Sequence, residues 1–185
     1  MTLSSWIWIV SALAAFAAME GWAAFLHGRV WHHALWRIHR SHHTKRRGPF
    51  EQNDALSFLH APVATGLILY GCAGAPGPLR DVAFGFGLGM TAFGVAYVLV
   101  HDGLVHRRLP VSGLARIPYL ARVRDAHRVH HSTGGPPFGL FLGPLALARR
   151  AARAAPAERA APAQRAAPAQ RAAPAERAAP AQRAR

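Results

Sequence analysis

The stretch HGRVWHHALWRIHRSHH, residues 27–43, follows a long apolar run and carries six of the chain's twelve histidines. Its spacing recurs later in the chain, where a second block, residues 101–131, opens with HDGLVH and closes with HRVHH. Each block contains two histidines five positions apart, followed by a cluster of the form His-x2-His-His. A spacing that occurs twice indicates that these histidines act together.

Helix geometry relates the histidines within each block. An α-helix turns about 100° per residue, so the three histidines of each cluster share one face. His27 and His32 are five positions apart, which would place them about 140° apart on an ideal helix. His101 and His106 have the same spacing. Either a π-bulge brings the members of such a pair together, or each member binds a different ion; π-bulges are frequent at functional sites.

The duplicated pattern predicts a metal centre. Neutral imidazole is a common metal ligand, and so many protonatable rings would repel one another without a partner to hold them. Ten ligands are too many for one ion, so we expect two ions, each bound by about five imidazoles and keeping an open position, unlike the closed site of structural zinc. The predicted ligands are His27, His32, His39, His42, His43, His101, His106, His127, His130 and His131.

Carboxylates near the two blocks are candidates for orienting the imidazole N–H groups. They are Asp102, Asp125, Glu51 and Asp54. Asp54 has an alternative role as the cap of the helix that follows it. His33 and His60 lie outside the pattern and are expected to be surface or satisfied core residues. The single cysteine, Cys72, allows no disulfide within the chain and no Cys-x2-Cys site.

Composition and hydropathy predict an all-α integral membrane protein. The chain is 51% hydrophobic yet has a net charge of +14, which is consistent if the apolar residues cross a membrane and the charges lie outside it. Three apolar runs, residues 3–26, 55–73 and 82–100, are each long enough to cross about 30 Å of hydrocarbon. A fourth segment, residues 138–148, is too short to cross and is expected to be interfacial or re-entrant.

The distribution of charge predicts the topology. Three spans place both histidine blocks on one side, and the basic residues of that side indicate the cytoplasm. No proline interrupts residues 27–43, so the first helix is expected to continue out of the membrane. Glu20 within the first run is costly unless it is paired or faces a cavity. Four glycines in the third run favour close helix packing, with a cavity for a slender ligand as the alternative.

Two parts of the chain are expected to differ in order. Residues 1–150 are predicted to form a membrane domain. Residues 151–185 repeat a six-residue unit rich in alanine, proline and arginine, which offers no large apolar side chain to bury, so we predict a disordered tail. Much of the basic charge lies in this tail and in loops, and no basic module with interleaved aromatic residues is present, so nucleic acid is not an expected partner.

Several strings resemble the bacterial β-carotene hydroxylases of the membrane fatty-acid hydroxylase superfamily. They are the His27 and His32 pair, HRSHH from His39, FEQND from Phe50, HDGLVH from His101, HRVHH from His127 and FGLFLGP from Phe138. The histidine motifs are typical of the superfamily, and the HDGLVH and FEQND strings narrow the resemblance to the carotenoid branch. The resemblance spans roughly residues 5–148.

The resemblance implies a non-haem di-iron monooxygenase of a bacterial inner membrane, with its histidine site on the cytoplasmic side. It implies two iron ions, dioxygen as co-substrate, and hydroxylation of the β-ionone rings of a carotenoid in the bilayer at C3, from β-carotene through cryptoxanthin to zeaxanthin. Electrons would come from an external donor such as ferredoxin with its reductase, because the chain has no flavin or nicotinamide fingerprint. Residues 45–47 could dock the donor, although positive-inside topology alone also explains them.

Two alternatives remain open at this stage. A related di-iron oxygenase could act on a ketocarotenoid, a sterol or a fatty acyl lipid. A non-enzymatic membrane protein could bind a metal or haem through the same histidines. Transport sites lie near the bilayer midplane, however, whereas these histidines follow the ends of the apolar runs.

Overall fold

The computed structural model describes residues 2–45 and 48–160, and within these ranges every regular element is helical. The predicted all-α class is therefore confirmed. The elements are α1 (Leu3–Phe25), the π-helix η1 (Leu26–Trp31), α2 (Trp36–His39), the 3₁₀ helix η2 (Arg40–His43), α3 (Asp54–Phe58), α4 (His60–Ala73), α5 (Pro78–Tyr97), the π-helix η3 (Val98–Val105), the 3₁₀ helix η4 (Ser112–Arg116), α6 (Pro118–Thr133) and α7 (Gly143–Ala160).

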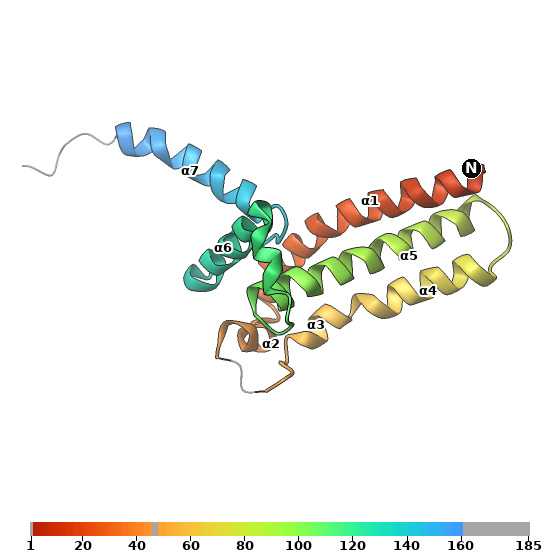
Figure 1. Cartoon of the computed structure of the whole chain (residues 1–185), viewed down its shortest axis with the longest axis horizontal. Helices are drawn as coiled ribbons and strands as arrows, with labels where there is room; N and C mark the ends of the chain where they lie inside the picture. The colour runs from red at the N-terminus through yellow and green to blue at the C-terminus, as the bar shows by residue number, and fades with distance from the viewer. Residues whose placement is uncertain (1, 46–47, 161–185) are drawn as a thin grey trace, which may run out of the picture.

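Three long apolar helices form a bundle, in which α5 lies between α1 and α4 (Figure 1). The three segments long and apolar enough to cross a membrane are Leu3–Trp31, Asp54–Ala73 and Pro78–Val105. This fits a membrane protein and agrees with the predicted number of spans. α1 and α5 end at the same end of the bundle, where α2 and α6 lie (Figure 1). Both histidine blocks therefore lie at the same end of the bundle, as the three predicted spans require.

Glycines allow the central helix to approach its neighbours closely. A Cβ atom at Gly85 or Gly89 would collide with the backbone carbonyls of Trp8 or Ala12 in α1, and one at Gly87 would lie 2.9 Å from the Ala64 carbonyl oxygen in α4. Residues without side chains let helix backbones pack tightly in an apolar medium. The packing role predicted for the glycines of the third run is confirmed at these three positions.

The long helices α1 and α5 each continue into a π-helix, η1 after α1 and η3 after α5. In η1 the His32 N–H donates to the His27 carbonyl over 3.1 Å, and in η3 the His106 N–H donates to the His101 carbonyl over 3.0 Å. These are hydrogen bonds between residues five positions apart, which define π-helical geometry. The wider turn brings each pair onto one side of the helix, so of the two predicted explanations for the five-residue spacing the π-helix is confirmed.

The prediction that the first helix continues through residue 43 is wrong. The helix ends at Trp31, residues 32–35 form a turn, and the chain resumes as α2 and η2. On a straight helix, His39 would lie about 18 Å beyond His27 at 1.5 Å per residue. The turn instead packs the buried His39 ring against Trp31, with ring centroids 5.7 Å apart.

Residues 138–148 do not behave as one segment. Residues 138–142 contain no regular helix and lie against the bundle, whereas α7 begins at Gly143 and extends away from it (Figure 1). Glu20 of α1 anchors the first part, since its buried Oε1 accepts a hydrogen bond of 2.8 Å from the Leu142 N–H. The charged residue within the first span is thus paired with backbone at the start of α7.

The predicted division of the chain at residue 150 falls within α7 and stays a prediction. α7 continues to Ala160, so the first ten residues of the predicted disordered tail are helical. The alanines of the repeat are strong helix formers, which is a physical reason for the extension. The rest of the predicted tail, residues 161–185, lies outside the described residues.

Candidate metal centre

The histidines converge at the end of the bundle in two sets. We define the first histidine group as the five residues whose candidate ligand nitrogens all lie within 4.8 Å of one another: His27, His32, His39, His43 and His130. His27 comes from η1, His32 from the turn that follows it, and the others from α2, η2 and α6. Four predicted ligands of the first block are thus joined by one residue that lies far away in the sequence.

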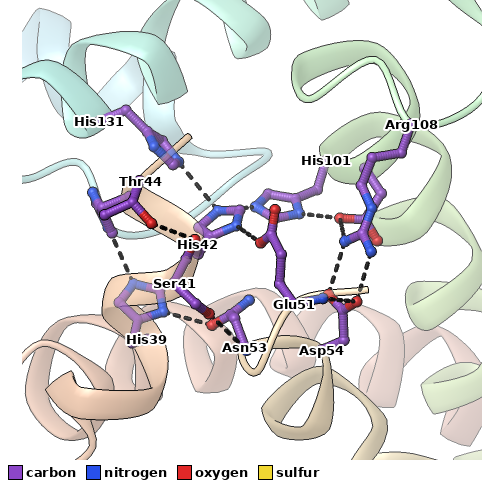
Figure 2. Close-up of polar contacts among 12 residues, drawn as sticks. His39, Ser41, His42, Thr44, Glu51, Asn53, Asp54, His101, Arg108 and His131 are labelled. Carbon is purple, nitrogen blue, oxygen red and sulfur yellow. Dashed lines mark hydrogen bonds and ion pairs between the residues drawn. The ribbon is translucent and has the colours of Figure 1, made fainter. Parts of the chain in front are cut away.

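The second set mirrors the first. His42, His106, His127 and His131 also place candidate ligand nitrogens within 4.8 Å of one another. His101 adjoins them, because its Nε2 lies 3.1 Å from Nε2 of His42 (Figure 2). We define the second histidine group as these five residues. The structure therefore brings all ten predicted ligands together, five in each group; their binding of metal stays a prediction.

Each His-x2-His-His cluster is divided between the groups. In the first cluster, His39 and His43 belong to the first group and His42 to the second. In the second cluster, His127 and His131 belong to the second group and His130 to the first. Every cluster thus keeps its first and last histidines for its own group and contributes the middle one to the other group. This reciprocal exchange gives the duplicated spacing its structural meaning.

The nitrogen spacing fits metal ions. Ligand nitrogens bound at about 2.1 Å and at right angles to each other lie about 3.0 Å apart. Nε2 of His131 lies 3.0 Å from Nε2 of His127 and 3.1 Å from Nε2 of His42. In the first group, the Nε2 atoms of His39 and His43 are 3.2 Å apart.

Two ring nitrogens without hydrogen-bond partners also fit metal binding. Nε2 of His27 and Nε2 of His106, one in each group, are buried and have no hydrogen-bond partner. A buried polar atom without a partner is costly, and an ion bound at each group would satisfy it. The residues present therefore fit a pair of metal ions.

Burial keeps the rings in the form that binds metal. Removal from water, the largest cause, lowers the pKa of His39 to about 4 and that of His131 to about 3. The same cause holds the pKa of His42 well below its usual value, and the neighbouring histidines add to it by charge repulsion. These three rings are thus neutral at pH 7, and a neutral imidazole has a free lone pair for a metal.

Neutral oxygens orient the imidazoles of the first group. The Nδ1–H of His27 donates to the Phe138 carbonyl over 2.9 Å, and that of His130 donates to the Gly135 carbonyl over 2.6 Å. The Nδ1–H of His39 donates to Oδ1 of the buried Asn53 over 2.7 Å (Figure 2). Each bond fixes the tautomer that leaves Nε2 facing the group.

Carboxylates orient two imidazoles of the second group. The Nδ1–H of His101 donates to Asp102 over 2.9 Å, and the Nδ1–H of His42 donates to Glu51 over 3.3 Å (Figure 2). Asp102 and Glu51 therefore occupy the supporting positions that were predicted for them. Arg108 lies behind these acids, with Nη1 3.7 Å from the carboxylate of Asp102.

The other two predicted carboxylates lie elsewhere. Asp54 accepts two hydrogen bonds from Arg108, of 2.7 and 2.6 Å, and one from the Glu51 N–H, so it holds the loop rather than an imidazole (Figure 2). It is the first residue of α3, whose cap is Asn53. Asp125 is 57% exposed at its side chain and pairs with Arg124 and Arg128. In the described part of the chain, the hydrogen bonds and ion pairs of these two carboxylates go to arginines and to backbone, not to an imidazole.

Sequence reasoning missed three supporting oxygens. Asn53 lies within the FEQND string, which drew attention to the acids on either side of it but not to the amide. The carbonyls of Gly135 and Phe138 have no signal in the sequence, because every residue carries one. Phe138 also packs its ring 5.8 Å from the centroid of His27, and a Cβ at Gly28 would collide with that ring.

The two histidines outside the pattern lie outside both groups. His33 is exposed. His60 accepts a hydrogen bond of 2.9 Å from the indole N–H of Trp22. These positions agree with the prediction that both are surface or satisfied core residues.

Known proteins resemble this chain over the region that carries both groups. The model of the fatty acid hydroxylase family matches residues 12–145. The chain is 48% identical over 138 residues to the chloroplastic β-carotene 3-hydroxylase 1 of Arabidopsis thaliana, covering 74% of this chain and 44% of that protein. It is 47% identical over 135 residues to the β-carotene hydroxylase of Pseudescherichia vulneris, covering 73% of this chain and 72% of that protein.

The chain covers the plant relatives only in part. The chain spans less than half the length of the plant relatives, including the chloroplastic β-carotene hydroxylase 2 of Capsicum annuum, which is 48% identical over 138 residues with 44% of its length covered. No solved structure matches. The family model covers both histidine blocks, most of the first long apolar helix and all of the other two, and this chain belongs to the fatty acid hydroxylase family.

Proposed function

We propose that this protein is a β-carotene 3-hydroxylase that adds hydroxyl groups to the β-ionone rings of β-carotene, giving cryptoxanthin and then zeaxanthin. The observation that carries the proposal is the pair of histidine groups at the end of an apolar bundle, in a chain 47% identical to a bacterial β-carotene hydroxylase. The names of the relatives support the carotenoid branch of the family over sterol or fatty acyl substrates.

The proposed cofactors are two non-haem iron ions, one in each histidine group, with dioxygen as co-substrate. Iron held by imidazoles with an open position supplies the oxidising power that an unactivated ring C–H bond requires. The chain's own part is to hold neutral imidazoles at fixed angles. The oxygens of Phe138, Asn53 and Gly135 do this in the first group, and those of Glu51 and Asp102 in the second.

The surroundings of the centre favour an apolar substrate. A long polyene stays in the bilayer, so its ring must meet the metals at the membrane surface. The histidine groups lie where η1 and η3 end, immediately beyond the long apolar helices. Buried Val100, Leu104 and Val123 form an apolar cluster beside the second group. Such packing excludes water from the site.

The proposed setting is the inner membrane of a bacterium with the histidine site facing the cytoplasm. The basic residues that follow the first span favour this orientation. An acidic ferredoxin with its reductase is the proposed electron donor, and Lys45, which is exposed, belongs to the basic surface that would meet it. Arg46 and Arg47, which follow Lys45 in the sequence, lie outside the described residues.

The test is expression in bacteria that accumulate β-carotene, followed by separation of the pigments and iron analysis of the purified protein. The expected result is cryptoxanthin and zeaxanthin, with about two irons per chain, as two complete imidazole sets require. The matched negative control is His130→Ala. Persistence of β-carotene alone, with verified protein and an adequate electron supply, would contradict the proposal. A Soret band from haem would contradict the di-iron assignment.

A further inference from the structure

A cavity of about 520 Å³ lies between α4 and α5, with α1 at its side. Such a volume falls within the range of about 300–1,000 Å³ that is usual for small-molecule sites. Its lining is mostly apolar and includes Met90, Phe93 and Val95 of α5, Ala61 of α4 and Met19 of α1. A cavity of this size and character suits an apolar ligand.

The inner wall of the cavity touches the metal centre. Trp31 and Tyr97 both line the cavity. The Trp31 ring lies 5.7 Å from the centroid of His39, in the first group, and the Tyr97 ring stacks on His101, in the second group, with centroids 4.6 Å apart. Two aromatic side chains that line the cavity therefore lie directly against a histidine of each group.

The outer side of the cavity faces the surroundings of the bundle. Val95 and Val98 line it and are 56% and 41% exposed on the surface of the long helices. Phe58, at the end of α3, is 63% exposed and lines it from the opposite side. In a bilayer these side chains face lipid, so the cavity can be entered sideways from the hydrocarbon.

The end of the cavity beside the histidine groups carries charged residues. Asp54 and Arg108 line it there and neutralise each other through an ion pair of 2.6 Å. Arg108 is therefore already partnered and would not hold the headgroup of a phospholipid or the carboxylate of a fatty acid.

A glycine creates part of the space. A Cβ atom at Gly94 would meet nothing within 4 Å, and Gly94 lines the cavity. At Gly85, Gly87 and Gly89 of α5, the backbone of α1 or α4 occupies the space in which a side chain would lie. The alternative that the sequence left open for these glycines, a cavity for a slender ligand, thus applies at Gly94, while helix packing applies at the rest.

We propose that this cavity binds the ring end of the carotenoid substrate, with the polyene chain leaving toward the bilayer past Val95 and Val98. The proposal rests on the proposed function, because it names where the substrate of that reaction lies. Three observations carry it: the apolar lining, the opening toward lipid, and the shared wall of Trp31 and Tyr97 with the two histidine groups. A fatty acyl chain is the competing occupant that the experiment separates.

The experiment compares two glycines that differ in one respect. Gly94 and Gly66 both lie in long apolar helices, and a Cβ at either meets nothing within 4 Å, but Gly94 lines the cavity and Gly66 does not. Gly94→Leu fills the cavity, whereas Gly66→Leu adds the same side chain outside it. Both changes raise helix propensity equally, so a difference between them reports the cavity.

Three quantities are measured for each full-length protein: iron per chain, zeaxanthin and cryptoxanthin formed in β-carotene-accumulating bacteria, and β-carotene retained by the purified holoprotein without an electron donor. Gly94→Leu is expected to keep its iron and to lose at least about tenfold in hydroxylated product and in retained β-carotene. The leucine side chain would take up space that the ligand needs, and overpacking of this kind lowers binding by about that factor. Gly66→Leu is expected to match the wild type in all three.

Ala61→Leu provides a second obstruction from the α4 wall and is expected to reproduce the Gly94→Leu result. Wild-type levels of product and retained β-carotene in both cavity variants would overturn the proposal. Iron loss in both would also overturn it, because these positions would then serve the scaffold.

The outcome for the wild type separates this proposal from the proposed function. If the wild type leaves β-carotene unchanged, the proposed function fails. If it hydroxylates β-carotene and the cavity variants do so equally well, only the cavity assignment fails. Retained fatty acyl lipid in place of β-carotene, lost selectively in Gly94→Leu, would assign the cavity to the competing occupant and overturn the carotenoid proposal.

Discussion

The two histidine groups have the same number of imidazoles but different supports. In the first group, the Nδ1–H groups of His27, His39 and His130 donate to carbonyl and amide oxygens, which carry no net charge. In the second group, those of His101 and His42 donate to carboxylates. The duplicated sequence pattern thus builds two sites that are alike in ligands and unlike in charge.

This difference has a chemical consequence. An imidazole that donates to a carboxylate is a more basic ligand than one that donates to a carbonyl. The second group also has negatively charged carboxylates beside it, which would stabilise a cation bound there. We therefore expect the second group to bind its ion more tightly and to favour the more oxidised form of iron. Four predictions test this comparison.

The largest effect is expected from loss of a ligand. His43→Ala in the first group and His131→Ala in the second are each expected to abolish activity and to lower the iron content to about half, because each removes one ligand from one ion. His33→Ala is the matched control, since His33 is exposed and outside both groups. Iron analysis and the pigment assay measure the outcome. Equal iron loss in all three variants would show that the grouping is wrong.

The next effect is expected from removing a supporting charge. Asp102→Asn keeps the size of the side chain but removes the carboxylate that holds His101. Loss of such a support typically weakens metal binding about 10–100-fold. Competition with a chelator should show one ion leaving at a lower chelator concentration while the other is retained.

Asp125→Asn is the control for this change, because Asp125 is exposed and pairs with Arg124 and Arg128. A chelator profile identical for Asp102→Asn and the wild type would remove the proposed difference between the groups.

A smaller effect is expected from Glu20, which acts on the first group through the backbone. Glu20→Ala leaves the Leu142 N–H without its acceptor and loosens the segment whose Phe138 carbonyl holds His27. A broken buried hydrogen bond to a charged group costs about 1.5–3 kcal/mol. We expect only a several-fold loss of activity, because this loss reaches the first group only through the backbone.

Glu20→Gln separates anchoring from charge, because its amide oxygen can still accept from Leu142. It is expected to recover most of the activity and of the iron in the first group. If Gln behaves as Ala does, the negative charge rather than the hydrogen bond is what matters, and the anchoring role is refuted.

The smallest effect is expected from making the first group resemble the second. Asn53→Asp places a carboxylate on the His39 Nδ1–H with almost no change in shape. It should strengthen iron binding in the first group by a few-fold and narrow the difference between the two chelator midpoints, because a charge-assisted hydrogen bond is stronger than a neutral one. An unchanged midpoint would mean that support charge does not set the affinity.

Much of the centre could be predicted from local spacing. The ten histidines and their location beyond the apolar runs follow from the periodicity of a helix and from the length of a membrane span. The π-helical turns at His27 and His101 are one of the two explanations that the spacing allows. These are short-range properties, so the sequence contains them directly. The number of spans and the common side of the two blocks follow for the same reason.

The failures lie where distant segments meet. Residues 32–35, which form the turn, contain no proline or glycine that would predict it. The turn forms because His39 packs against Trp31 rather than continuing along the helix axis. Asp125 lies near the second cluster in sequence but on the outer face of α6, while Asn53 reaches His39 across 14 positions. Proximity along the chain does not show which side chain a folded segment presents to the site.

The sequence by itself determined the ligand types, their spacing and the apolar helices that carry them, because these depend on residue identity and helical repeat alone. Only the tertiary structure decided which histidine belongs to which group. His42 and His130 each cross to the group built mainly by the other block, and that exchange needs α2 with η2 to fold back against α6. The reason is physical: two residues one position apart on a helix point about 100° apart, so neighbours in a cluster face different histidine groups once a second helix closes over them.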